Sequence, residues 1–292
     1  MRIVQVSPFF SPHAGGVESH VRTLAVELAR RGHEVTVLTS RFRGNLPAVE
    51  QRDGYRILRA PTLGVLFNTP LDWGAGRVLR GLEADIVHLH FPPPLSSFFA
   101  TQGLRDRRVP VCMTYHCDLF LAGRLGRGIS WFYERTLLPP TLARVDRIIV
   151  HTQSYGTTSA VLRGRELEII PSVVDLQRFR PGLDASGPRK KLGLQGKRVL
   201  VFIGRLVTHK GVDVLLRAVA ELPQDVHLVV VGRGPRLVDL EGLARRVGVA
   251  DPVHFCVPAL YSCSDHYTFC DLIRICDPSR YDDPPFPYDL LR

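Results

Sequence analysis

The chain alternates between short apolar runs and segments in which apolar residues recur every three or four positions. The first run, "RIVQVS" at 2–7, is typical of a buried strand. Apolar residues between Val17 and Leu28 then share one face of a predicted helix, which ends at Gly32 and precedes the strand-like "EVTVLTS" at 34–40. This alternation predicts a parallel β-sheet covered by helices on both faces.

The same alternation continues and then restarts. Further strand-like runs are "YRILRA" at 55–60, "DIVHLH" at 85–90, "VPVCMTYH" at 109–116, "RIIVHT" at 147–152 and "LEIIP" at 167–171, with helical segments at 95–107 and 127–145. A second series has strands at 197–204, 226–232 and 253–255 and helices at 211–222 and 235–247. Pro, Gly and charged residues accumulate between the two series, as in a linker. The sequence therefore predicts two α/β units, 1–171 and 197–255, joined by a linker at 172–196.

Composition indicates a folded protein with anionic partners. The chain is 45% hydrophobic and 23% charged, with a net charge of +10, and has no apolar run long enough to span a bilayer. Such a basic chain suggests a nucleotide, a nucleic acid or an anionic membrane surface as partner, although a soluble protein from an arginine-rich proteome explains it equally. The start "MRIVQVSPFF" looks like a strand and not a signal peptide, so we expect a cytoplasmic location.

Glycines and cations follow the predicted strands, at the end of a parallel sheet where ligands bind. Gly15 and Gly16 precede the first helix, whose free N–H groups attract anions, although a tight turn at positive φ explains the pair as well. Later, Gly204 ends a strand, Arg205 follows it, and Lys210 lies next to the following helix. A guanidinium fork and an ammonium at one point would neutralise a diphosphate; the alternative is two solvated surface cations.

Histidines and a further glycine also end strands. His116 in "TYHCD" is a candidate acid, base or sugar-hydroxyl ligand, or a hydrogen-bonded core residue. His88 and His90 share a strand face without a convincing metal partner, so we expect structural or acceptor-lining roles for them. Gly232 in "VVVGRGP" is suited to close approach by a base or ribose, but the motif does not match a nicotinamide fingerprint.

Taken in order, these stretches resemble the family-4 (group 1) glycosyltransferases of the GT-B fold over residues 1 to about 255. The matching stretches are "GGVESHV", "RGHEVTVLTS", "DIVHLH", "TYHCD", "RIIVHT", "IIPSVVDLQRFRP", "IGRLVTHKGVDVLL" and "LVVVGRGP". The first two are most similar to members that glycosylate phosphatidylinositol or other lipids. The resemblance implies two Rossmann-like domains with a nucleotide-sugar between them.

By this resemblance, Gly15 and Gly16 lie against the donor phosphates, Arg205 and Lys210 grip the diphosphate, and His116 faces the transferring sugar. The implied reaction moves a sugar from a nucleoside diphosphate to an acceptor hydroxyl, sugar or lipid-linked, with retention at the anomeric carbon. Gly204 and Gly232 complete the expected donor site. No metal, cofactor or nucleic acid is implied, and a peripheral contact with the inner membrane face is compatible with the basic first domain.

The family pattern is lost near residue 256. The usual N-G-V-D is replaced by Ser172, Val173, Val174 and Asp175, and residues 256–292 lack the expected glutamate-containing loop. That tail has six aspartates, three arginines and the cysteines Cys256, Cys263, Cys270 and Cys276. We interpret it as an aberrant segment that leaves the second domain incomplete, in preference to a zinc site with His266 or a disulfide set.

Three functions remain at this point. A retaining glycosyltransferase, active or inactive in this truncated form, accounts for most of the motifs. A nucleotide-sugar 2-epimerase has a similar fold but requires paired carboxylates in the second domain, which the sequence does not present. A non-catalytic nucleotide-binding remnant fits the incomplete second domain.

Overall fold

The computed structural model describes residues 1–256 except 14, 67–68, 93, 120, 122 and 177–178. The tail expected at 256–292 lies outside the described residues apart from Cys256, and so does the alternative of a zinc site there. Contacts within the chain divide it into two compact units, Met1–Asp175 and Leu176–Arg292.

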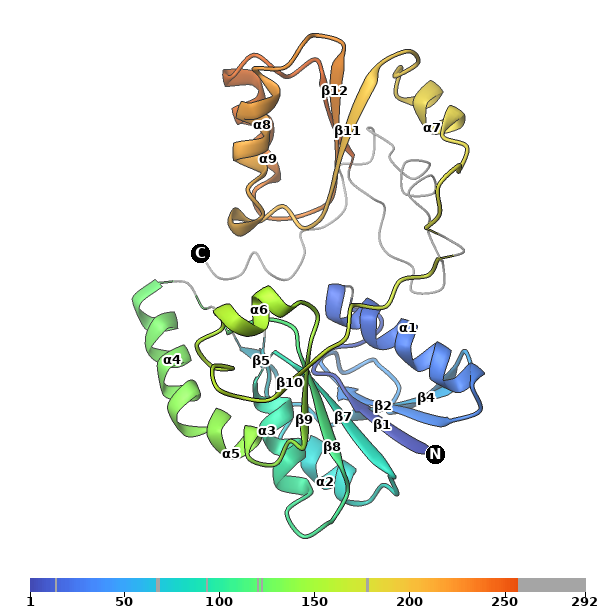
Figure 1. The fold of residues 1–292 in the computed structure, drawn as a ribbon, viewed down its shortest axis with the longest axis vertical. Helices are drawn as coiled ribbons and strands as arrows, with labels where there is room; N and C mark the ends of the chain where they lie inside the picture. The colour runs from blue at the N-terminus through green and yellow to red at the C-terminus, as the bar shows by residue number, and fades with distance from the viewer. Residues whose placement is uncertain are drawn as a thin grey trace. The chain divides into compact units, whose positions relative to one another are not determined.

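The first unit contains a mainly parallel β-sheet (Figure 1) with the strand order β10-β9-β8-β7-β1-β2-β4-β3. Its strands are β1 (Arg2–Val6), β2 (Glu34–Ser40), β3 (Val49–Arg52), β4 (Tyr55–Ala60), β7 (Ile86–Phe91), β8 (Val111–Tyr115), β9 (Arg147–Val150) and β10 (Leu167–Ile169). Only the β3–β4 pair of this sheet is antiparallel among the described strands. A separate antiparallel pair is formed by β5 (Val65–Leu66) and β6 (Thr69–Pro70).

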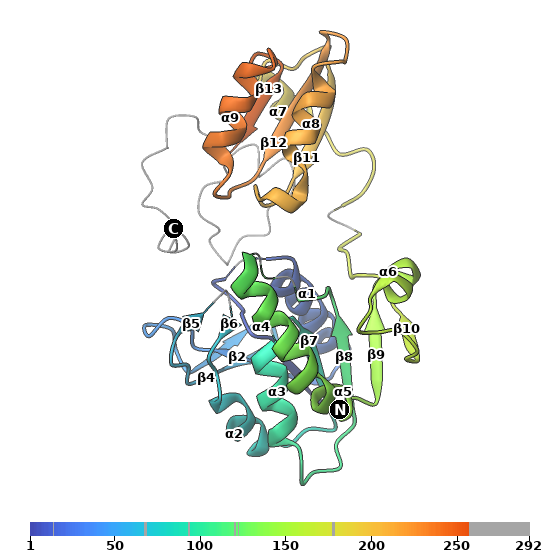
Figure 2. The same cartoon turned by 90° about the vertical axis from the view of Figure 1, so that its left-hand side faces the viewer.

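Helices cover both faces of this sheet. They are α1 (Gly16–Arg30), α2 (Gly74–Arg80), α3 (Pro94–Gly103), α4 (Gly123–Thr136), α5 (Leu138–Leu142) and α6 (Gln153–Thr158). Helix α1 packs on one face, over Val35, Val37 and Ile57. Leu89 and Met113 point to the other face and join the core shared with α2, α3 and α5. Figure 2 shows α3 and α4 on the side of the sheet opposite α1.

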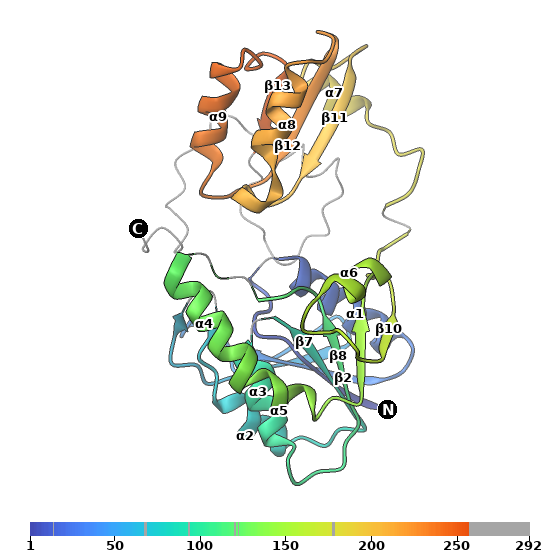
Figure 3. The same cartoon turned by 60° about the vertical axis from the view of Figure 1, so that its left-hand side comes forward.

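The second unit contains a three-stranded parallel sheet among its described residues, in the order β11-β12-β13. Its elements are α7 (Ser186–Lys191), β11 (Arg198–Ile203), the 3₁₀ turn η1 (Thr208–Lys210), α8 (Val212–Val219), β12 (Val226–Val231), α9 (Leu237–Arg246) and β13 (Val253–Cys256). Helices α8 and α9 lie side by side on one face (Figure 3), packed on Leu228 and Val230. Leu194, which follows α7, packs with Val229 and Val231 on the other face.

The strands and helices predicted from the sequence are found in the structure, but several elements differ. The structure adds α2, α6, β5 and β6, which the sequence does not predict. Helix α7 lies inside the predicted linker. The segment predicted as one helix at 127–145 forms two, α4 and α5, because Pro139 and Pro140 cannot donate the backbone hydrogen bonds that a continuous helix requires. Strand β3 adds an antiparallel edge that the strand–helix alternation did not predict.

Candidate functional site

Strand alternation gathers histidines on the α1 face of the first sheet. In β1, Val4 and Val6 belong to the core on the α2 face, so Gln5 points to the side of α1. The same alternation in β7 turns His88 and His90 to that side. His116 and His151 follow β8 and β9 directly, and the parallel order β1-β7-β8-β9 brings all of these positions together.

The histidine cluster, defined as His20, His88, His90, His116 and His151, is held by ring contacts and hydrogen bonds. The centroid of the His20 ring, from α1, lies 5.2 Å from that of His116 and 5.1 Å from that of His151. The His88 and His90 rings are 4.2 Å apart, and His88 Nε2 lies 2.8 Å from Thr114 Oγ1. His20 Nδ1 lies 3.1 Å from Ser172 Oγ, which ties α1 to the segment after β10.

Burial keeps most of this cluster uncharged. It lowers the pKa of His20 to about 4 and those of His88 and His116 to about 3. It also moves the pKa of His90 well below its ordinary value. At neutral pH these rings are therefore neutral hydrogen-bonding groups, suited to polar contacts such as sugar hydroxyls and unsuited to act as cations.

Both ring nitrogens of His116 are used within the cluster. Its Nε2 atom lies 3.3 Å from Nδ1 of His90, and its Nδ1 atom lies 3.0 Å from Nε2 of His151. A sugar hydroxyl that contacts His116 must therefore replace one of these neighbours. Asp118 does not contact the ring nitrogens, because its Oδ1 atom accepts hydrogen bonds from Tyr115 at 3.0 Å and Ser159 at 2.7 Å.

The N-terminus of α1 is occupied by a carboxylate of the chain itself. Gly15 caps the helix in an extended conformation, with φ of −170°, and neither Gly15 nor Gly16 has a positive φ. The tight-turn explanation for these glycines is therefore wrong. Glu18 folds back so that its carboxylate fills the space where a Cβ of residue 15 would lie, and it contacts His13 Nδ1 at 2.9 Å. Nothing lies within 4 Å of the corresponding position on Gly16.

In the second unit, the loop between β11 and α8 carries the predicted cations. Arg205 and Lys210 are both exposed, and neither forms an ion pair with any residue that the structure describes. Gly211 takes a left-handed conformation, with φ of 65°, and caps α8. Glycine is favoured there because other residues are strained in that region.

Gly232 is required by packing inside the second unit. A Cβ atom on it would overlap the carbonyl oxygen of Gly204, and one on Gly234 would overlap that of Leu206. The backbone of the β12–α9 loop therefore lies directly against that of the β11–α8 loop. This contact explains the absence of a side chain at Gly232 without a ligand, so its role in donor binding stays a prediction.

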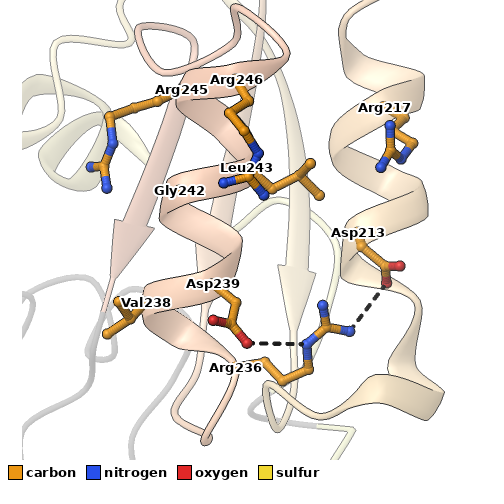
Figure 4. Close-up of a pocket in the computed structure, with 9 residues that line it drawn as sticks. All are labelled: Asp213, Arg217, Arg236, Val238, Asp239, Gly242, Leu243, Arg245 and Arg246. Carbon is orange, nitrogen blue, oxygen red and sulfur yellow. Dashed lines mark ion pairs between the residues drawn. The ribbon is translucent and has the colours of Figure 1, made fainter.

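A cavity of about 470 Å³ lies between α8 and α9 (Figure 4), and Arg236 of the β12–α9 loop contributes to its lining. Arg236 lies between Asp213 at 4.0 Å and Asp239 at 3.8 Å. The arginines Arg217, Arg245 and Arg246 also line this cavity, which includes neither Arg205 nor Lys210. Its open, polar lining shows no convergent set of reacting groups.

Two general features complete the description of these sites. Among the described residues, no group of three His, Cys, Asp or Glu side chains is arranged to hold a metal ion. Within the same residues, no helix combines the length and the apolar character that crossing a bilayer requires.

His20 and His151 are site residues that sequence reasoning missed. The signal for His151 was present, because "VHLH", "TYH" and "IVHT" each place a histidine at the end of a predicted parallel strand. His20 lies on the buried face of α1, next to Val21 and Ala25, and only the packing of that helix shows that it joins the cluster.

Comparisons with known proteins agree with this architecture. A yeast relative, the phosphatidylinositol N-acetylglucosaminyltransferase GPI3 subunit of Saccharomyces cerevisiae, is 27% identical over 82% of this chain and 54% of its own length. A GDP-mannose-dependent alpha-(1-6)-phosphatidylinositol monomannoside mannosyltransferase of Mycolicibacterium smegmatis is 30% identical over 84% of the chain and 64% of its own length. The chain thus spans between half and two thirds of these relatives.

Solved structures show the same fold. A sucrose-phosphate synthase from Thermosynechococcus elongatus matches 87% of this chain and 69% of its own, with a TM-score of 0.69 and 23% identity. HepE of Anabaena, in complex with UDP and glucose, matches 88% of this chain and 69% of its own, with a TM-score of 0.67 and 20% identity. The fold is therefore GT-B.

Two family profiles cover most of the chain. The profile described as Glycosyltransferase Family 4 matches residues 14–178, and the one described as Glycosyl transferases group 1 matches residues 187–268. The second match extends past residue 255, where the family pattern was expected to stop. The histidine cluster and the α1 N-terminus fall in the first match, and the β11–α8 loop falls in the second. The chain belongs to the family-4, group 1 glycosyltransferases.

Proposed function

We propose that this chain transfers a sugar from a nucleoside-diphosphate sugar to an acceptor hydroxyl, with retention at the anomeric carbon. The observation that carries this proposal is the pair Arg205 and Lys210. Both cations lie at the carboxyl end of β11, on one loop, and neither is neutralised by the residues that the structure describes. Uncompensated cations at this end of a parallel sheet are suited to a polyanionic ligand.

The reaction places its largest charge change on the leaving group. As the bond from the anomeric carbon to the phosphate oxygen breaks, negative charge builds on the diphosphate and positive charge on the sugar ring. The guanidinium of Arg205 offers paired donors to phosphate oxygens, and the ammonium of Lys210 adds a compact charge. Fixed cations that stabilise developing charge lower the barrier, so this role requires no metal ion.

The other site groups are assigned to binding. Gly16 leaves the start of α1 free of a side chain for a phosphate oxygen, with the helix dipole behind it, and the Glu18 carboxylate that lies over Gly15 must move aside for such a ligand. Gly204 and Gly232 keep the backbone next to Arg205 free of side chains. His116 contacts a hydroxyl of the transferring sugar as a neutral ring, because burial lowers its pKa to about 3.

A lipid-linked acceptor is supported by the relatives. The two described above are named for reactions on phosphatidylinositol and on a phosphatidylinositol monomannoside. A substrate of this kind would bring the protein to a membrane surface as a peripheral partner. Basic groups for an anionic leaflet are available in the first unit at Arg22, Arg30, Arg31, Arg41 and Arg43. Of these, Arg22 pairs with Asp53 and Arg31 with Glu27.

A transfer assay tests this proposal. The full chain is incubated with radiolabelled UDP-glucose, UDP-N-acetylglucosamine or GDP-mannose and a lipid extract, and labelled lipid is separated from free sugar. We expect label in the lipid fraction, with an α-linked product from an α-linked donor. Arg205→Ala or Lys210→Ala reduces turnover by about 100-fold or more, while Arg217→Ala, an exposed cation elsewhere on the same unit, does not.

The outcomes separate the alternatives. Nucleotide binding without transfer to lipid or sugar acceptors favours a non-catalytic binding module. Recovery of an epimerised donor favours a 2-epimerase. Absence of nucleotide binding overturns both enzyme assignments.

A further inference from the structure

Four side chains and one backbone carbonyl form a continuous hydrogen-bonded chain in the first unit. Nε2 of His90 lies 3.1 Å from the amide oxygen of Gln5, and Nδ1 of His90 lies 3.3 Å from Nε2 of His116. Nδ1 of His116 lies 3.0 Å from Nε2 of His151, and Nδ1 of His151 lies 3.1 Å from the carbonyl oxygen of Ile170. We call this set the imidazole chain.

The carbonyl end determines the direction of every bond in the imidazole chain. The Ile170 oxygen only accepts, so His151 must donate from Nδ1. A neutral imidazole has one N–H group, so Nε2 of His151 accepts from Nδ1–H of His116. By the same reasoning, Nε2 of His116 accepts from Nδ1–H of His90, whose Nε2 then carries a lone pair. The side chain of Gln5 must therefore donate.

The amide of Gln5 is able to supply that donor. With its oxygen toward His90, its nitrogen is buried and has no hydrogen-bond partner among the described residues. Because the oxygen and nitrogen of an amide are nearly isosteric, half a turn about the last side-chain bond exchanges them. The turned amide donates to Nε2 of His90, and its oxygen then takes the position at which no described residue offers a partner.

The alternative arrangement requires one extra proton. If the Gln5 oxygen faces His90, then His90 and His116 donate from Nε2, and His151 must donate from both nitrogens. The extra proton then lies on His151, whose ring centroid is 5.1 Å from that of His20 and 5.0 Å from that of His116. Burial lowers the pKa of His116 and of His90, so neither of these rings takes up the proton in its place.

We propose that Gln5 is a positioning residue, whose amide N–H supports the direction that the Ile170 carbonyl imposes on the imidazole chain, so that His116 carries its proton on Nδ1. This inference rests on the proposed function for its catalytic meaning. His151 is the less buried neighbour of His116, so it is the one that a sugar replaces. His116 then offers an N–H donor to a sugar oxygen, and Gln5 supports this polarity through His90, although it does not contact His116 directly.

The test is the ring protonation pattern of the full chain, labelled with ¹⁵N-histidine and observed in long-range ¹H–¹⁵N correlation spectra. In the native protein we expect His116 to show a protonated Nδ1 and an unprotonated Nε2. When it is ionised, the carboxylate of Gln5→Glu only accepts, so at a pH where it is ionised His116 should move its proton to Nε2 or become doubly protonated. Gln5→Met, which is similar in length and has no donor or acceptor, should keep the native pattern.

Three results would overturn this inference. They are a native His116 protonated on Nε2, a Gln5→Glu protein with the native pattern, and a Gln5→Met protein that changes like Gln5→Glu. The first needs no variant, so the test holds even if a variant fails to fold. None of these spectra requires a sugar donor, so their outcome is independent of whether the protein transfers sugar.

The transfer assay gives the catalytic readout. If Gln5 supports the polarity of His116, Gln5→Glu lowers kcat/KM by about tenfold, the equivalent of one lost hydrogen bond, and Gln5→Met lowers it much less. A larger loss of kcat/KM in Gln5→Met than in Gln5→Glu contradicts the inference. If the native protein shows the expected tautomer of His116 but transfers no sugar, the proposed function is contradicted and this inference is not.

Discussion

Nε2 of His151 lies 3.0 Å from Nδ1 of His116, so rings that follow two neighbouring parallel strands are joined by a hydrogen bond. This contact links the ends of β8 and β9 at the edge of the sheet where ligands bind. It also makes His116 part of a buried polar network. The protonation of this network affects stability as well as function.

The stability of the first unit should depend on pH through the histidine cluster. Burial lowers the pKa of His20 to about 4 and those of His88 and His116 to about 3, from 6.5. Below pH 6.5 the unfolded chain therefore binds more protons than the folded protein. The free energy of unfolding falls as the pH drops toward about 4, by up to about 1.4 kcal/mol per pH unit for each ring.

Urea denaturation at about pH 7.5 and about pH 5 measures this dependence. His88→Asn should give a smaller loss of stability at the lower pH, and His33→Asn, outside the cluster, should match the native protein. The buried carboxyl of Asp72 has a raised pKa, so its contribution to stability falls as the pH rises. This one group is outweighed by the three histidines. Equal free energies of unfolding at the two pH values would contradict the conclusion that the histidine cluster is neutral in the folded protein.

Replacement of Asp72 by asparagine should stabilise the folded protein. Its side chain is buried, Oδ2 accepts a hydrogen bond from Ser96 at 2.7 Å, and Oδ1 has no hydrogen-bond partner within the described part of the chain. Burial raises its pKa from 3.8 to about 6, so stability is lost as the pH rises through this interval. Asp72→Asn should raise the free energy of unfolding at about pH 7.5 by about 1–3 kcal/mol.

The matched control for this change is Asp106→Asn, at an exposed position. Its stability should stay within about 0.5 kcal/mol of the native value. An Asp72→Asn protein that is less stable than the native one at both about pH 5 and about pH 7.5 would contradict this prediction. It would show that contacts in the folded protein offset the cost of burying the Asp72 carboxylate.

Gly232 should not tolerate a methyl group. Because its Cβ would overlap the Gly204 carbonyl oxygen, Gly232→Ala must displace the β11–α8 loop, at a cost of about 1–3 kcal/mol. Gly242→Ala, in α9, meets only the end of the flexible Arg246 side chain and should stabilise the helix by up to about 1 kcal/mol. Chemical denaturation of both variants checks this contrast, and equal effects would contradict it.

Sequence patterns predicted the strands, the loops that follow them and the positions of Arg205, Lys210 and His116, because these depend on local alternation and chain order. They did not predict that Glu18 covers Gly15 or that Gly232 packs on Gly204, since both contacts depend on side-chain and loop placement. The linkage of His20 to His116 depends on how α1 packs on the sheet. Such long-range packing leaves no periodic signal in the chain.

Glu18 should oppose an incoming phosphate at the start of α1. Its carboxylate lies over Gly15, where the helix dipole attracts anions. Glu18→Gln keeps the size of the side chain and removes its charge, so UDP or GDP should bind about fivefold more tightly, corresponding to about 1 kcal/mol. Glu27→Gln, at the far end of the same helix, is the control. An unchanged or weaker affinity for Glu18→Gln would indicate that no phosphate reaches this helix.

The central claim is that Arg205 and Lys210 hold a diphosphate, and isothermal titration with UDP and GDP tests it most directly. The native protein should bind at least one of the two, and the heat signal should weaken as salt increases. Arg205→Ala and Lys210→Ala should each reduce affinity by about tenfold or more, while Arg217→Ala changes it by less than about twofold. Native binding that survives both substitutions, or a native protein that binds neither nucleotide, would contradict the account.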